Sequence, residues 1–121
     1  MAHLTVTLSE PMAAKLGALP PAEQRKIAEE IRELAEEAIK MREFPDIYFM
    51  DGATGRRAVV SDGIDVWEII EPYYVHGKSW DVLRESYPDL PESVLRAAIR
   101  YYEAYPEEIE ERIRRNQDVE S

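Results

Sequence analysis

The first residues of the chain alternate between apolar and polar side chains. Apolar Leu4, Val6 and Leu8 are interleaved with polar His3, Thr5 and Thr7. A period of two residues places the two sets on opposite faces of a β-strand. Ser9 follows and is a residue type that caps helices. We therefore expect an N-terminal strand and then a short helix over residues 10 to about 18, which Pro20 ends.

A longer helix is expected from residue 21 to about residue 43. Proline is tolerated in the first turn of a helix because its missing N–H would have no partner there. Apolar residues recur at three- and four-residue steps, at Ile27, Ile31, Leu34, Ala35, Ala38 and Met41. Charged residues occupy most of the remaining positions, so the pattern predicts an amphipathic helix that buries one stripe.

The rest of the chain predicts a β-hairpin followed by helices. Residues 47–50 and 57–60 flank a glycine-containing loop at 51–55, which is typical of a hairpin. Helical periodicity covers residues 65 to about 75, 79 to about 87 and 91 to about 105, and a last helix begins at 106. His76-Gly77 is the stop signal of the first of these helices, and Ser79 is the expected N-cap of the second. We predict a mainly α fold with a small β component. An N-terminal strand–helix–helix region covers residues 1–45, and a domain of hairpin and helices covers 46–121.

Composition restricts the class of protein further. The chain has 121 residues, no cysteine and a formal net charge of −10. It lacks an apolar run of about 18 residues, so no membrane span is expected, and it lacks the layout of a signal peptide. Together with the absence of cysteine, this favours a cytoplasmic protein. The negative charge opposes non-specific nucleic-acid binding by the whole surface.

Two short helices joined by "PDLP" (residues 88–91) have the layout of a helix-turn-helix. In that unit the second helix enters the major groove of DNA. Its apolar positions are Val94, Leu95, Ala98, Ile99 and Tyr102, which leaves Glu92, Ser93, Arg96, Ala97 and Arg100 facing outward. An arginine fork can bind guanine or phosphate. We therefore name as candidate DNA-binding residues Ser93, Arg96 and Arg100, with Lys78, Arg84, Arg56 and Arg57 as backbone contacts. The alternative is an amphipathic helix with arginines on its solvated face, and for Arg56 and Arg57 the alternative is salt bridges to the acidic helices.

From residue 46 onward the chain resembles the DUF433 family, in a longer form found among antitoxins of the VapB type. The resemblance rests on "DGATGRRAVV" (51–60), "DVWEII" (65–70) and "YPDLPESVLRAAIRYYEAYPEEIEERI" (87–113) and covers about 70 of the 121 residues. The family's "GTRIPV" segment is "SDGIDV" here, so roles of its arginine and proline cannot be transferred. The resemblance implies a homeodomain-like helix-turn-helix, operator binding and pairing with a PIN-like ribonuclease toxin.

The N-terminal segment resembles, more weakly, the strand and first helix of a ribbon-helix-helix antitoxin. In that arrangement two chains pair their strands, and His3, Thr5 and Thr7 would enter the major groove. Pro20 and Pro21 count against it, because they remove N–H donors that would otherwise contact phosphate. We interpret the strand and the long helix mainly as the interface of a homodimer.

Catalytic and metal sites find little support in the sequence. His3 and His76 are the only histidines and lie far apart in the chain, which argues against a histidine triad or metal site. Four aspartates near the hairpin could hold a divalent ion, but turn and cap roles explain them better: Asp46, Asp51, Asp62 and Asp65. We expect no enzyme activity, cofactor or metal. Among the aromatic residues, Tyr101 and Trp80 are candidates for an association surface.

The last sixteen residues are rich in charge, with Ile109, Ile113 and Val119 as their apolar side chains. Two interpretations remain open. The segment can be a frayed helix that docks on the toxin, or an ordered helix packed on the chain's own core. The expected partners are thus a PIN-like toxin, operator DNA and a second copy of the chain, and the toxin would bind the N-terminal region or this tail.

Overall fold

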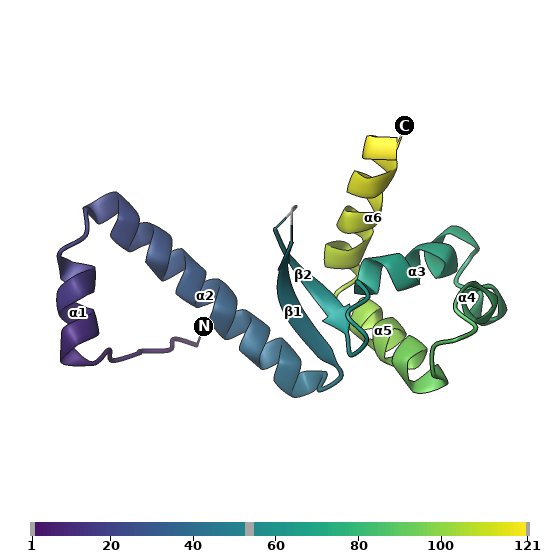
Figure 1. The fold of residues 1–121 in the computed structure, drawn as a ribbon, viewed down its shortest axis with the longest axis horizontal. Coiled ribbons are helices and arrows are strands. Elements are labelled where there is room, and N and C mark those ends of the chain that lie inside the picture. Colours follow the sequence, from purple (N-terminus) through teal and green to yellow (C-terminus); the bar gives the residue numbers. More distant parts are fainter. Residues whose placement is uncertain (1, 53–54, 121) are drawn as a thin grey trace. The chain divides into compact units, whose positions relative to one another are not determined.

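The computed structural model describes residues 2–52 and 55–120. The fold is mainly helical with a two-stranded sheet, which confirms the predicted fold class (Figure 1). Its elements in chain order are α1 (Glu10–Gly17), α2 (Pro21–Glu43), β1 (Ile47–Gly52), β2 (Gly55–Val60), α3 (Val66–Val75), α4 (Trp80–Ser86), α5 (Glu92–Ala104) and α6 (Pro106–Glu120). No helix in the described residues combines the length and the apolar character that crossing a bilayer requires.

The chain divides into two compact units, the first ending at Ala38 and the second beginning at Ile39, within α2. In the first unit, the predicted N-terminal strand is wrong for the single chain, because residues 2–9 form no strand. A strand requires a hydrogen-bonding partner, and the described part of the chain offers none to this segment. Leu4 and Val6 are consequently 77% and 57% exposed.

The apolar stripe of α2 is also uncovered within the chain. Ile31, Leu34 and Met41 are all exposed, with Leu34 at 55%. Helix α1 contains no buried residue at all. The helices therefore form where the periodicity predicts them, but their apolar faces lack the contacts that normally stabilise an amphipathic helix.

The second unit begins with the hairpin. β1 and β2 are antiparallel, with Ile47 opposite Val60 at one end and Gly52 opposite Gly55 at the other. The centre of the predicted loop, residues 53–54, lies outside the described residues. Gly63 has a positive φ of 83°, as the turn after β2 requires. Ala58 and Val60 belong to the hydrophobic cluster that the helices share, and Val59, on the opposite face of the strand, is buried as well at 2% exposure.

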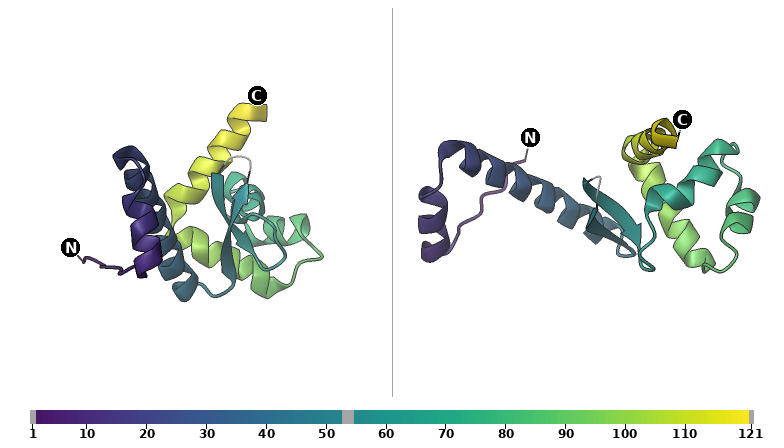
Figure 2. Two further views of the ribbon diagram at one scale, coloured as in Figure 1. Left: turned by 60° about the vertical axis from the view of Figure 1, so that its left-hand side comes forward. Right: turned by 45° about the horizontal axis from the view of Figure 1, so that its top comes forward.

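Helices α3, α4 and α5 pack on one another and form the three-helix group that the sequence predicts. Figure 2 shows them next to one another in two further views. Their shared core is fully apolar apart from two tyrosine hydroxyls and includes Val66, Ile69, Ile70, Leu83, Leu95, Ala98, Tyr101 and Tyr102. The N-cap prediction at Ser79 is confirmed, because its side chain accepts a hydrogen bond from the Val82 N–H at 3.3 Å.

Helix α6 packs on this core. Ile109 and Ile113 are 2% and 0% exposed and belong to the same hydrophobic cluster. The hydroxyl of Tyr101 donates to Glu108, and that of Tyr102 donates to Glu110 at 2.7 Å. The interpretation as a frayed tail that docks on a toxin through its isoleucines is therefore wrong, because both side chains are already buried in the chain itself.

Helix α5 buries a wider arc than its apolar stripe suggests. It contacts β1, β2, α3, α4 and α6, and this surrounds most of its circumference. Ala97, predicted to face outward, is 3% exposed, and Tyr101, predicted as an association surface, is fully buried. Both predictions are wrong because burial here is set by tertiary neighbours, which periodicity along one helix does not reveal.

Candidate nucleic-acid interface on helix α5

The turn between α4 and α5 is fixed by two side chains. Arg84 donates from Nη1 to the carbonyl oxygen of Leu90 at 2.6 Å. Tyr87 donates from its hydroxyl to the carbonyl oxygen of Glu68 in α3 at 2.8 Å. These bonds hold the start of α5 in place relative to α3 and α4. Arg84, predicted as a DNA-backbone contact, is thus half-buried and engaged in holding the turn.

The narrow exposed edge of α5 carries the three principal candidates. Ser93, Arg96 and Arg100 are all exposed, at positions that follow one another along the same side of the helix. Ser93 also borders a small pocket with Asp46, Val60, Ser61, Val94 and Ala97, at the base of the hairpin. The structure therefore brings these three residues together on one accessible surface.

Arg96 is accessible but already has partners. Its Nη2 lies 2.7 Å from Oε1 of Glu92, and its guanidinium lies 4.3 Å from the centre of the Trp80 ring. The side chain remains 53% exposed. An exposed ion pair of this kind contributes only about 0.3–0.5 kcal/mol, so a stronger anion can displace Glu92. The Trp80 ring also contacts the Arg96 guanidinium through a cation–π interaction.

Lys78 is exposed at the end of α3. Its backbone is left-handed, with φ 62°, and directly follows Gly77 with φ 65°. Its N–H donates to the carbonyl oxygen of Tyr73 at 2.7 Å, which closes the end of the helix. The ammonium lies 5.7 Å from the centre of the Tyr102 ring. The glycine stop predicted at residues 76–77 is confirmed.

Arg56 and Arg57 lie at a different place from the edge of α5. Both are on β2, and Arg56 is four residues, or about 13 Å of strand, away from Val60 beside Ser93. Arg57 Nε forms an ion pair with Asp65 Oδ1 at 2.8 Å, and Asp65 Oδ2 accepts from the indole N–H of Trp67 at 2.7 Å. Arg56 pairs with exposed Asp51 at 3.3 Å.

The role of Asp65 was missed in the sequence. Asp65 precedes α3 as expected of a cap residue, but its side chain makes no capping hydrogen bond. Its carboxylate is instead buried between Arg57 and Trp67 and links the hairpin to the first turn of α3. Both residues of the ion pair lie in "GRRAVVSDGID" (55–65), but eight positions separate them. They meet only because the chain turns between β2 and α3, which the sequence alone does not show.

Burial raises the pKa of several groups beside this core, among them Glu68, Tyr87 and Tyr102. The pKa of Glu68 is raised by burial and then by the nearby carboxylate of Asp65. The pKa of the Tyr102 hydroxyl is raised by burial and then by its hydrogen bond to Glu110. None of these three groups lies on the exposed edge of α5. In residues 2–52 and 55–120 no group of three or more histidine or acidic side chains is placed to hold a metal ion.

Comparisons with known proteins add one similarity. No protein-family model and no curated protein matches the chain. Among solved structures, it is similar to a DUF433 member protein from Anabaena variabilis, at 27% sequence identity and a TM-score of 0.45, over 88% of this chain and 98% of that one. The name of that protein gives its family and states no activity.

Proposed function

We propose that the chain is an antitoxin-type regulator that binds operator DNA through α5 and neutralises a PIN-like ribonuclease toxin. The observation that carries the DNA-binding part is the exposed edge of α5 with Ser93, Arg96 and Arg100, presented by three packed helices. The resemblance of residues 51–60, 65–70 and 87–113 to DUF433 antitoxins supports the toxin part.

The chemistry of this edge suits a duplex. A helix held by its apolar side presents two arginines one turn apart, and arginine forks bind both phosphate and the acceptors of guanine. Ser93, near the start of the helix, is placed where helix-turn-helix proteins contact base edges. Lys78 supplies a further exposed cation. Arg56 and Arg57 are left out of this surface because they lie elsewhere on the hairpin.

The N-terminal unit supports a homodimer as part of the proposal. Leu4, Val6 and Leu8 and the stripe of α2 are exposed in the single chain. A segment of fewer than about 40 residues rarely folds without additional contacts, and residues 3–8, which alternate like a strand but have no strand partner in the described part of the single chain, can pair with the same segment of a second copy. Within the proposal, the exposed apolar residues of the N-terminal unit are the surface that we assign to the toxin, because the isoleucines of α6 are buried.

The test of DNA binding is a double variant, Arg96→Ala with Arg100→Ala, in a mobility-shift titration with DNA from upstream of the chain's own coding region. Loss of two phosphate contacts lowers affinity and reduces the slope of log K against log salt by about 1.8. Arg25→Ala with Arg114→Ala removes the same charge at exposed positions on two other helices, α2 and α6, and is expected to change little. Equal affinity and slope in both double variants would refute the assignment.

A protein-interaction module that binds no DNA is the second candidate. Two observations favour it: the pairing of Arg96 with Glu92, and the net charge of −10. The same titration separates the two functions, because this candidate predicts no shift of the upstream DNA at low salt. The toxin part is tested independently, by whether the chain inhibits ribonuclease activity of a PIN-like protein encoded beside it.

A further inference from the structure

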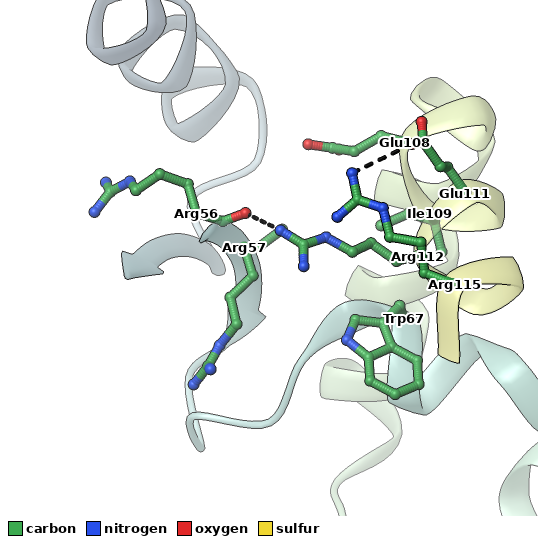
Figure 3. A pocket seen from close by; sticks show the side chains of 9 residues that line it. Arg56, Arg57, Trp67, Glu108, Ile109, Glu111, Arg112 and Arg115 are labelled. Carbon is green, nitrogen blue, oxygen red and sulfur yellow. Dashed lines mark hydrogen bonds and ion pairs between the residues drawn. The ribbon is translucent and has the colours of Figure 1, made fainter. Parts of the chain in front are cut away.

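A second cationic feature lies on the other end of the hairpin. A pocket of about 150 Å³ opens between β2, the first turn of α3 and α6. Four arginines line it against two glutamates, although the chain as a whole carries −10. Figure 3 shows Arg56 and Arg57 on β2, Arg112 and Arg115 on α6, and the Trp67 ring on α3. The guanidinium groups of Arg112 and Arg115 extend from α6, whereas those of Arg56 and Arg57 point away from α6 (Figure 3).

Arg112 is held in position by the hairpin. Its Nη2 donates to the backbone carbonyl oxygen of Arg56 (Figure 3). Arg115 is three residues further along α6, which places the two side chains on adjacent turns, with Cβ atoms about 5–6 Å apart. Like charges one turn apart destabilise a helix by about 0.2–0.5 kcal/mol, and an anion bound by both arginines would offset that repulsion. The pair therefore has the arrangement of an anion clamp.

The carboxylates near the pocket differ in how firmly they hold the arginines. Arg57 forms an ion pair with Asp65, whose side chain is only 9% exposed, so the carboxylate of this pair is shielded from water. Arg115 is paired with Glu111 at 3.3 Å, and both side chains are more than half exposed. Arg56 is paired with Asp51, which is 86% exposed. Exposed pairs are worth little, so Arg115 can exchange Glu111 for a stronger anion.

From this geometry we propose that the pocket binds a single phosphate group through Arg112 and Arg115, with Trp67 as its apolar wall. The volume is below the roughly 300 Å³ of sites that enclose whole small molecules, so it fits one phosphate and not a nucleotide. A tetrahedral phosphate can accept hydrogen bonds from two guanidinium groups on adjacent turns at once. A planar carboxylate matches the N–H donors of one guanidinium group. The phosphate can be inorganic or the terminal phosphate of a nucleic acid. The site does not depend on DNA binding by α5.

The two tryptophans of the chain give a direct readout. Trp67 lines this pocket, whereas Trp80 lies under Arg96 on α4. Inorganic phosphate is titrated at constant ionic strength while the two indole N–H signals are followed by NMR. A saturable shift of the Trp67 signal alone supports the pocket. No saturable shift overturns it, and a shift of Trp80 alone assigns the anion to the α5 edge and also overturns it.

Variants on α6 provide matched controls. Arg112→Ala and, separately, Arg115→Ala are each expected to weaken phosphate binding about tenfold, the usual effect of one lost charge-assisted bond. Arg114→Ala removes the same charge from the same helix outside the pocket lining and is expected to leave binding unchanged. Equal weakening in all three variants would show a general charge effect and overturn the proposal. Arg115 is more than half exposed, so its variant tests the site even if Arg112→Ala does not fold.

Two further ligands identify the source of the phosphate. A short single-stranded oligonucleotide is compared with and without a 5′-phosphate, and acetate serves as the carboxylate. Tighter binding of the phosphorylated oligonucleotide than of inorganic phosphate assigns the pocket to a nucleic-acid end, and the reverse order assigns it to free phosphate. Acetate that binds as well as phosphate would contradict the proposed selectivity.

Discussion

Replacement of Ile113 by alanine tests whether α6 belongs to the core. The side chain is fully buried and lies in the cluster shared by the hairpin, α3 and α5. The change removes three carbons, worth roughly 2.4 kcal/mol at about 0.8 kcal/mol each, and a cavity that does not collapse increases the loss to about 2–5 kcal/mol. The unit from residue 39 onward has an expected stability of about 4–12 kcal/mol, so the variant is expected to lose a large fraction of it.

The assay is urea unfolding followed by far-UV circular dichroism, with the free energy of unfolding extrapolated to water. Val75→Ala is the matched control, because that side chain is 54% exposed and alanine is the better helix former. Its free energy of unfolding is expected to stay within about 0.5 kcal/mol of the parent. A loss below about 0.5 kcal/mol for Ile113→Ala would show that α6 is not packed as described and would reopen its role as a docking segment.

Two further predictions concern buried polar groups. Asp65→Asn removes the carboxylate that pairs with Arg57, and the free energy of unfolding in urea is expected to fall by about 2–3 kcal/mol. The loss is smaller than for a fully buried pair because Arg57 stays partly solvated. An unchanged unfolding midpoint would contradict the link between the hairpin and α3. Burial and the bond to Glu110 raise the pKa of Tyr102, so the stability from its protonated hydroxyl is complete below about pH 10 and declines as the pH rises further. Tyr102→Phe is therefore expected to reduce the alkaline loss of stability, and an identical alkaline decline in both proteins would argue against it.

Local signals were sufficient to predict most elements. Ser79 caps α4, Gly77 ends α3, and Pro106 opens α6, each through a backbone preference that acts within a few residues. The exposed positions Ser93, Arg96 and Arg100 follow from the same local periodicity. These features need no knowledge of the tertiary fold.

Features that depend on distant partners were not predictable. The N-terminal segment alternates like a strand, but a strand exists only with a partner to bond with, and the single chain supplies none in its described part. Ala97 and Tyr101 are buried because several elements surround α5. The Arg57–Asp65 pair and the pocket between β2 and α6 join residues whose proximity arises only when the hairpin folds onto the helices.

The most direct test of the central claim is to map where DNA binds. Backbone amide shifts are followed by NMR while DNA from upstream of the coding region is added to the full chain. The account predicts the largest shifts at residues 92–100 on α5, with smaller shifts at Lys78. Shifts confined to residues 2–9, or no shifts at low salt, would contradict DNA binding by α5.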